Sequence, residues 1–309
     1  MPNCVPDFST CVENPAYSSP FFTTSQSDCY DNSGMIVCPN VGEPFYGQEP
    51  QFDYTEQDFT VETDVVLENV SGFIWQSELP DTYEGCSESY PVGSMCTYEE
   101  ARDYCANLEL GGYGKWRIPT LAQFISIMNF AKPAPLIFDY FPFLSNDYFL
   151  ISGSEKTTIA VWMSTGMSSS ALSGKVVCVS DPGGMSPKGS LLKTDNIFKA
   201  DNLFINIIDP EIPKTVFWQY DNAQSAVSWE EALGYCSNIE ENGVSGFRLP
   251  TVTELQFFAS KSSEHIETGV FWTSTTVHAT PSNSYTIDFA TGNIGMATKT
   301  GNNFVICVK

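Results

Sequence analysis

The sequence predicts an α+β protein in which one domain occurs twice, behind a cysteine-rich N-terminal segment. A motif appears in two copies: Thr97–Cys105 and Trp116–Thr120 return as Ser228–Cys236 and Phe247–Thr251, and both pairs start 131 residues apart. Each copy carries helical patterns and then alternating patterns typical of strands. The ten cysteines allow each copy to be closed by its own disulfide. One constant offset across matched aromatic and cysteine positions indicates a tandem duplication.

The domain boundaries follow from this repeat and from local composition. Residues 1–58 are rich in Pro, Ser, Asn and Asp and are predicted to form a loop-dominated segment. Copy one is expected over residues 59–180, a linker over 181–201 and copy two over 202–309. With 309 residues, 42% hydrophobic and 14% aromatic, the chain can bury a core in each copy.

Two helices are predicted in each copy from their N-terminal capping boxes. In this motif a Ser or Thr hydroxyl accepts from the amide three residues later, and a Glu or Gln there reaches back to the first amide. The boxes begin at Thr97, Thr120, Ser228 and Thr251. Apolar residues follow at helical spacing, so the cysteine of each first helix is expected on the buried face.

Strands account for most of the remaining pattern. Short extended pieces are expected between the two helices of each copy, at Trp116–Ile118 and Phe247–Leu249. The predicted strands are Phe73–Trp75, Val216–Trp218, Val270–Ser274, Ser284–Phe289 and Phe304–Val308. Each copy therefore reads as strand, helix, helix and then several strands, the last of which closes the domain.

The cysteines favour disulfides and a secreted or cell-surface location. There is no Cys-x-x-Cys, and His265 and His278 are the only histidines, so zinc sites and thioredoxin-like redox chemistry lose support. In each copy, the repeat pairs the cysteine of the first helix with the cysteine of the last strand. The remaining six cysteines then form three pairs that are close in the sequence. The predicted pairs are Cys105–Cys178, Cys236–Cys307, Cys29–Cys38, Cys86–Cys96 and Cys4–Cys11.

No apolar run approaches the roughly 20 residues that span a bilayer. The start of the chain also lacks the basic and apolar regions of a signal peptide. If the protein is exported, its signal is expected to have been removed.

The charge is strongly negative and uneven. The formal net charge is −23, and the first Lys or Arg is Arg102. Nucleic acid and acidic membrane surfaces are therefore poor partners, because both are polyanionic. The acidic residues are expected either to form a solvated exterior or to bind calcium, with Asp53, Asp58 and Asp64 as metal candidates beside Glu56 and Glu62. No EF-hand spacing supports the calcium alternative.

The motifs in this order resemble the Lcl C-terminal domain family of bacterial surface proteins. The family shows a Trp-Gln entry strand, a W-x-x-A-x-x-Y-C helix, a W-R-L-P-T turn, an E-L helix start, a W-S-S-T strand and a closing V-R-C-V. Copy two matches at Trp218-Gln219, Trp229–Cys236, Phe247–Thr251, Glu254-Leu255, Trp272–Thr275 and Val305–Val308. Copy one matches at Trp75-Gln76, Tyr98–Cys105, Trp116–Thr120, Trp162–Thr165 and Val176–Val179.

The resemblance implies a variant of the C-type-lectin fold, with two helices, a twisted antiparallel sheet and a disulfide from helix to last strand. It also implies a secreted or surface-attached protein, since the better-known members bind glycans or adhere to surfaces. One fold hosts many functions, so the function remains an expectation.

The two copies differ after the second helix. Trp162 lies 16 residues before Cys178, whereas Trp272 lies 35 residues before Cys307. Taking these tryptophans as counterparts predicts that copy one has lost a strand pair, which copy two carries between residues 285 and 299. Because late loops usually hold the ligand in lectin-like folds, copy two is the better candidate. Its candidate ligand-binding residues are His278, Asn283, Tyr285, Asn293, Asn302 and Asn303.

Other recurring residues have simpler structural explanations. Arg117 and Arg248 suit structural pairing with a helix Glu better than carboxylate binding. The tryptophans of the motifs suit core packing better than sugar stacking. The polar residues of the late loops also have an explanation without a ligand, because loops are usually polar.

No enzyme signature is present, whether GxSxG, HExxH, P-loop or a dinucleotide fingerprint. The sequence therefore predicts a non-catalytic extracellular protein that binds a glycan or a protein. The alternative is a structural subunit of an extracellular fibre, in which the acidic N-terminal segment docks on a neighbouring copy of the protein.

Overall fold

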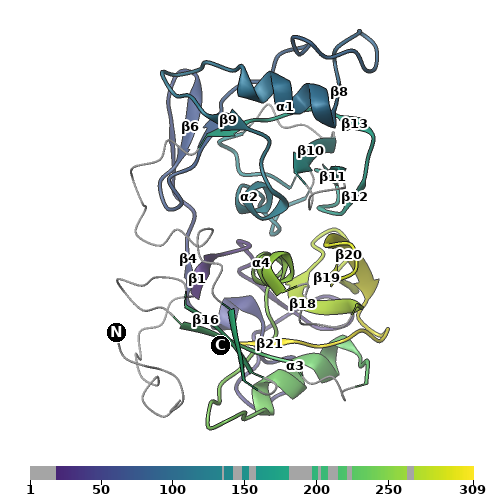
Figure 1. Ribbon diagram of the computed structural model, residues 1–309. Helices are drawn as coiled ribbons and strands as arrows, with labels where there is room; N and C mark the ends of the chain where they lie inside the picture. Colours follow the sequence, from purple (N-terminus) through teal and green to yellow (C-terminus); the bar gives the residue numbers. More distant parts are fainter. Residues whose placement is uncertain are drawn as a thin grey trace. The chain divides into compact units, whose positions relative to one another are not determined.

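A computed structural model of the chain describes nine stretches (Figure 1). They are residues 19–133, 136–141, 148–152, 158–180, 197–200, 203–207, 215–220, 225–262 and 268–309. The chain forms two compact units: unit 1 comprises Met1–Glu56 with Leu191–Lys309, and unit 2 comprises Gln57–Ser190. We call residues 19–56 the N-terminal segment.

Unit 2 combines two helices with small, mainly antiparallel sheets. Its five-stranded sheet has the order β5-β6-β7-β14-β9 and its three-stranded sheet the order β10-β11-β12, while β13 pairs with β8. The elements are β5 (Phe59–Val61), β6 (Val65–Glu68), β7 (Ile74–Gln76), β8 (Cys96–Thr97), α1 (Tyr98–Ala106), β9 (Trp116–Arg117), α2 (Leu121–Ser126), β10 (Tyr148–Ser152), β11 (Thr158–Trp162), β12 (Ser168–Ser170), β13 (Ser173–Gly174) and β14 (Val179–Ser180).

Unit 1 has the same kinds of element and, in addition, the N-terminal segment. One sheet has the order β15-β16-β17-β21 and another the order β18-β19-β20. These elements are β15 (Ile197–Ala200), β16 (Leu203–Ile207), β17 (Thr215–Gln219), α3 (Trp229–Asn238), α4 (Val252–Ser262), β18 (Val270–Thr276), β19 (Asn283–Asp288), β20 (Asn293–Thr298) and β21 (Cys307–Val308). The segment contributes β1 (Ser19–Phe22), β2 (Cys29–Tyr30), β3 (Met35–Ile36), the 3-10 turn η2 (Glu49–Gln51) and β4 (Tyr54–Thr55). Within it β1 pairs with β4 in parallel and contacts α4 (Figure 1).

All four predicted helices begin at their capping boxes. Thr97, Thr120 and Ser228 each accept from the amide three residues on, and the Glu or Gln at that position returns the bond. At the start of α4, the Thr251 amide donates to Glu254 Oε2 at 2.8 Å and the Glu254 amide donates to Thr251 Oγ1 at 3.3 Å. Each box gives hydrogen-bond partners to two backbone amides that would otherwise lack them, and this fixes the residue at which each helix begins.

Four of the five predicted disulfides are confirmed. They are Cys29–Cys38, Cys86–Cys96, Cys105–Cys178 and Cys236–Cys307. The long pairs tie α1 to the residue before β14, and α3 to the first residue of β21. The fifth prediction, Cys4–Cys11, lies outside the described residues.

The tryptophans of the motifs are mostly core residues. Trp75, Trp218 and Trp272 have no exposed surface, and Trp116 is 3% exposed. In unit 1 the Trp218 ring stacks on Phe258 with centroids 4.3 Å apart. The core-packing interpretation is correct for these four, whereas Trp162 is only partly buried.

The prediction that copy one lost a strand pair is wrong. After α2 the strands β10, β11 and β12 form a three-stranded sheet, just as β18, β19 and β20 do after α4. Phe149 of β10 forms a parallel bridge to Lys175, as Phe271 of β18 does to Phe304. The residue after Phe149, Leu150, is therefore the counterpart of Trp272.

Trp162 is not the structural counterpart of Trp272, although the two residues are of the same type. It ends β11 and pairs with Tyr148, so it belongs to the second strand of the sheet. Leu150 is fully buried, so the core position that Trp272 fills in copy two holds a smaller side chain in copy one.

The predicted strand Phe304–Val308 is divided between two sheets. Phe304 bridges to β18, whereas Cys307 and Val308 pair with β17. Among the described helices the longest is α4, with 11 residues, and none of them is long and apolar enough to cross a membrane.

Candidate functional site

The N-terminal segment is attached to the rest of unit 1 by hydrogen bonds that span most of the sequence. The Gln26 amide group acts like a strand residue at the end of β18: its Nε2 donates to the Thr276 carbonyl at 2.5 Å, and its Oε1 accepts from the Thr276 amide at 3.0 Å. Gln26 is buried, so both bonds are shielded from water. They hold the segment in one register against β18.

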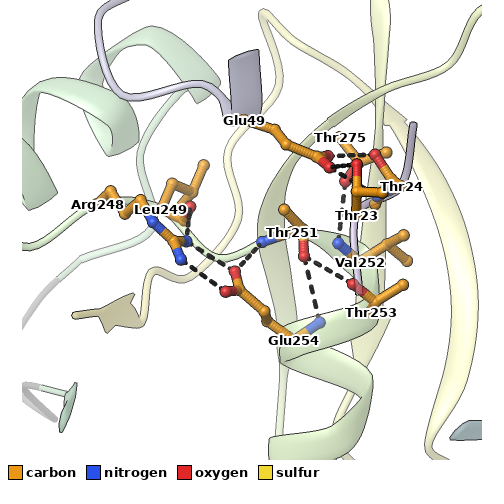
Figure 2. A network of polar contacts seen from close by, with 10 residues as sticks. All are labelled: Thr23, Thr24, Glu49, Arg248, Leu249, Thr251, Val252, Thr253, Glu254 and Thr275. Atoms are coloured by element: carbon orange, nitrogen blue, oxygen red, sulfur yellow. Dashed lines mark hydrogen bonds and ion pairs between the residues drawn. The ribbon is translucent and has the colours of Figure 1, made fainter. Parts of the chain in front are cut away.

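A buried ion pair lies at a second point of attachment (Figure 2). Arg248 Nη2 and Nη1 donate to Glu254 Oε1 and Oε2 at 2.6 and 2.7 Å, a bidentate geometry. Both side chains are almost fully buried, at 8% and 0% exposure. The structural pairing predicted for Arg248 is confirmed. In copy one the counterpart Arg117 donates to a neutral acceptor, Gln123 Oε1, at 2.7 Å.

Two aromatic rings of the segment flank the same guanidinium. Arg248 Cζ lies 5.3 Å from the Phe52 centroid and 5.0 Å from the Tyr54 centroid. Burial alone would lower the pKa of Arg248, but the charge of Glu254 and the contribution of Tyr54 outweigh it and the pKa is raised. The guanidinium therefore stays charged and joins α4 to the segment by ionic and cation–π contacts.

Glu49 lies close to this pair and is buried, with 3% exposure (Figure 2). Its Oε1 accepts from Thr23 Oγ1 at 2.7 Å and from the Thr24 amide at 2.6 Å, and its Oε2 is bonded to Thr24 Oγ1. Burial raises its pKa to about 7, against the lowering effect of these bonds, and the charge of Glu254 raises it further.

Lys299 forms a third point of attachment. It follows β20, has no exposed surface, and donates from Nζ to the Asp31 carbonyl at 2.8 Å. The same nitrogen lies 3.9 Å from the Trp229 centroid and 5.5 Å from that of Tyr30. Burial lowers the pKa of Lys299 to about 7, although the charge of Asp31 acts in the opposite direction.

We expect the attachment of the segment to weaken between about pH 4.5 and 7 because of Glu49. The pKa of this carboxyl is raised on folding, so its contribution to stability is fully present below pH 4.5 and declines as the pH rises to about 7. The loss is about 3 kcal/mol. Glu49→Gln keeps the acceptor for Thr23 and the Thr24 amide and should remove this decline. Amide hydrogen-exchange protection factors for residues 23–52 at pH 4.5 and 7 measure it.

Glu56→Gln is the matched control, since this carboxylate is exposed in the same segment. It should keep the wild-type pH dependence. The same decline in Glu49→Gln would mean that Glu49 does not cause it.

A pocket of about 420 Å³ opens beside the ion pair. It is lined by Pro50, Gln51, Phe52, Asp53, Gly246, Arg248 and Lys309. Its walls thus come from three distant parts of the chain: the N-terminal segment, the turn before α4 and Lys309 after β21. Gly246 has φ +78°, a conformation that other residues rarely adopt, and a Cβ there would lie 3.8 Å from Lys309 Nζ. Because residues 50–53 of the segment form one wall, the pocket exists only when the segment is docked.

The residues predicted to bind ligand are only partly brought together. Asn283 starts β19, and His278 lies in the turn before it. The Lys299 amide donates to Ser282, which brings the turn of Asn302 and Asn303 to the same end of the sheet. Asn293 lies at the opposite end, because it pairs with Asp288.

The prediction that Tyr285 is a ligand-binding residue is wrong, because binding a ligand requires an exposed side chain. Tyr285 is 1% exposed, since its side chain faces the core from the central strand β19. Burial raises its pKa well above the ordinary value.

The metal candidates do not form a cluster. Asp53 belongs to unit 1, whereas Asp58 and Asp64 belong to unit 2. Asp58 Oδ2 accepts from Asn69 Nδ2 at 3.1 Å. Within the described stretches, no group of three or more His, Cys, Asp or Glu side chains could hold a metal ion.

Sequence reasoning missed Glu49, Lys299 and the pocket. The partners involved are far apart in the chain: 250 residues separate Gln26 from Thr276, and 268 separate Asp31 from Lys299. No local motif marks such contacts. The sequence offers one signal: Lys299 directly follows a predicted strand region in a chain that has only 14 Lys and Arg residues.

Comparison with protein families gives one match in two segments. Residues 64–181 and 212–309 match the family described as the Lcl C-terminal domain. Together they cover more than half of the chain, and their order is consistent with tandem copies. A comparison with curated proteins found no match.

Proposed function

Because the chain belongs to the Lcl C-terminal domain family, we propose that it is a secreted or surface-exposed protein that binds a glycan or a protein without catalysis. The disulfides of the described stretches are compatible with an oxidising, extracellular setting.

We further propose that each matched segment is a lectin-like domain. Each has two helices, and in each a disulfide ties the first helix to the closing strand region. Each also has a three-stranded antiparallel sheet after its second helix. The recurrence of this order within one chain supports the proposal.

The observation that carries the binding function is the pocket beside Arg248. Its volume of about 420 Å³ lies in the range of small-molecule and sugar sites. Its wall is held rigidly, since Arg248 is fixed by Glu254 and by the flanking rings. A preformed site of this kind avoids the free-energy cost of ordering its groups on binding.

The lining groups suit a hydroxyl-rich ligand. Asp53 supplies a hydrogen-bond acceptor, Lys309 supplies a donor, and the Phe52 ring supplies an apolar surface for a sugar face. The nearby Glu49 carboxyl is bonded to Thr23 and Thr24 and buried, so it serves the fold and cannot contact a ligand.

A glycan array with and without calcium tests this function. We expect binding to at least one glycan, and isothermal titration then gives its Kd for the wild type and for Asp53→Asn. Asp53 is exposed and lines the pocket, so the variant should fold normally and lose about fivefold to tenfold in affinity, because a charge-assisted hydrogen bond becomes a neutral one.

Asn302→Ala is the matched control for the late loops, because Asn302 is exposed in the same unit. Loss of affinity in this variant and not in Asp53→Asn would move the site to the late loops. No binding to any glycan in either condition would refute a glycan ligand.

One observation favours the structural alternative, a subunit of a fibre. The N-terminal segment docks on the C-terminal part of unit 1, although residues 57–190 of unit 2 separate the two parts in the sequence. The same contacts made with a second chain would join molecules into an assembly. Light scattering after size exclusion decides: a strict monomer over a wide concentration range argues against it.

A further inference from the structure

The Cys86–Cys96 loop of unit 2 is rigid. Besides the disulfide, the Tyr83 amide donates to Gly93 at 2.8 Å and the Gly93 amide donates to Glu88 at 3.2 Å. Tyr83 anchors the loop, because its ring is buried against Tyr104 and its hydroxyl accepts from the Val176 amide at 3.1 Å. The tip is thus preorganised without a ligand.

This rigid loop holds apolar side chains in water. Tyr90 is 93% exposed and Val92 69% exposed, with the exposed Pro91 between them. The residue before them, Ser89, has φ +69°, a conformation that costs a non-glycine residue about 1 kcal/mol. Isolated exposed apolar residues are ordinary, whereas three in succession at the tip of one loop form a continuous apolar patch.

The sequence around the tip is acidic. Between Ser77 and Thr97 the chain has four carboxylates, Glu78, Asp81, Glu84 and Glu88, and neither Lys nor Arg. A Cβ added at Gly93 would lie 3.7 Å from Thr82 Cβ and 3.0 Å from the Cys86 carbonyl, so the stretch carrying Glu84 runs beside the tip.

We propose that this tip is a docking surface for a basic polypeptide. The Tyr90 ring takes a Lys or Arg side chain by a cation–π contact, and Pro91 and Val92 cover its aliphatic stem. The carboxylates of Asp81 and Glu84 attract the cations. A second copy of the chain fits poorly, since each carries a net charge of −23, and an anionic membrane is repelled for the same reason.

Titration of the full chain with a twelve-residue Ala-Lys repeat peptide tests this surface. We expect Tyr90→Ser, which changes no charge, to weaken binding about fivefold. Asp81→Asn/Glu84→Gln should weaken it and also reduce its salt dependence. Val37→Ser is the matched control, since Val37 is also 93% exposed but belongs to unit 1, and it should leave the Kd unchanged.

Equal affinity for wild type, Tyr90→Ser and Val37→Ser would show general attraction to an acidic protein and overturn the proposal. Binding of cellohexaose that Tyr90→Ser abolishes, with no effect on peptide binding, would assign the tip to a neutral glycan and also overturn it. Dimerisation of the wild type that Tyr90→Ser abolishes would assign the tip to a second copy of the chain and would also overturn the proposal. The pocket of unit 1 is untouched in all these variants, so its test remains separate.

Discussion

Replacing Arg248 with Met is expected to destabilise unit 1 by about 3–5 kcal/mol. Glu254 has no exposed surface, so the variant leaves a buried carboxylate without its cation. The change also removes the guanidinium from between Phe52 and Tyr54, so the N-terminal segment should lose hydrogen-exchange protection. Urea unfolding combined with exchange mass spectrometry measures both effects.

The chain supplies a matched control for this prediction. Arg117 occupies the same place in copy one but donates to the neutral Gln123, so Arg117→Met leaves no buried charge. Its cost should be about 1–2 kcal/mol. The double variant Arg248→Met/Glu254→Gln should recover part of the loss. Equal costs at the two arginines would contradict the role given to the buried charge.

Replacing Cys236 and Cys307 together with Ala should cost about 4 kcal/mol. The disulfide closes a separation of 71 residues and ties α3 to β21. Without it the unfolded chain gains conformational freedom, and two positions of the core lose their sulfur atoms. The free energy of unfolding of unit 1, followed by thermal and urea denaturation, measures the effect.

The short disulfide of the same unit is the control. Cys29 and Cys38 are nine residues apart, so removing both should cost about 2.5 kcal/mol in the same chain-entropy treatment. If removing the short disulfide lowered the stability as much as removing the long one, packing in the folded state would matter more than the entropy of loop closure.

Local and repeated features of this chain were predictable. The four helix starts followed from capping boxes, because both partners of each box lie within four residues. The long disulfides followed from the repeat, which stands in for an alignment. The same comparison failed where it relied on residue type: Trp162 resembles Trp272, but strand pairing identifies Leu150 as its counterpart.

The candidate site was not predictable for a physical reason. Arg248 and its helix partner Glu254 could be inferred from their spacing, but the rings of Phe52 and Tyr54 that complete the site could not. Burial also determines which pKa values shift: the pKa of Glu49 is raised because the carboxyl is removed from water, although the hydrogen bonds from Thr23 and Thr24 act in the opposite direction. Enclosure is a property of the folded chain and leaves no pattern in the sequence.

The discontinuity of unit 1 has a consequence for the order of folding. Unit 2 is one continuous stretch, Gln57–Ser190, so it can close while the chain is still being made. Residues 19–56 emerge earlier but must wait for partners such as Thr276, 250 residues later. We therefore expect Cys105–Cys178 to oxidise before Cys236–Cys307 during biosynthesis. Until the partners of unit 1 have been made, the acidic N-terminal segment remains undocked beside a unit 2 that can already be closed.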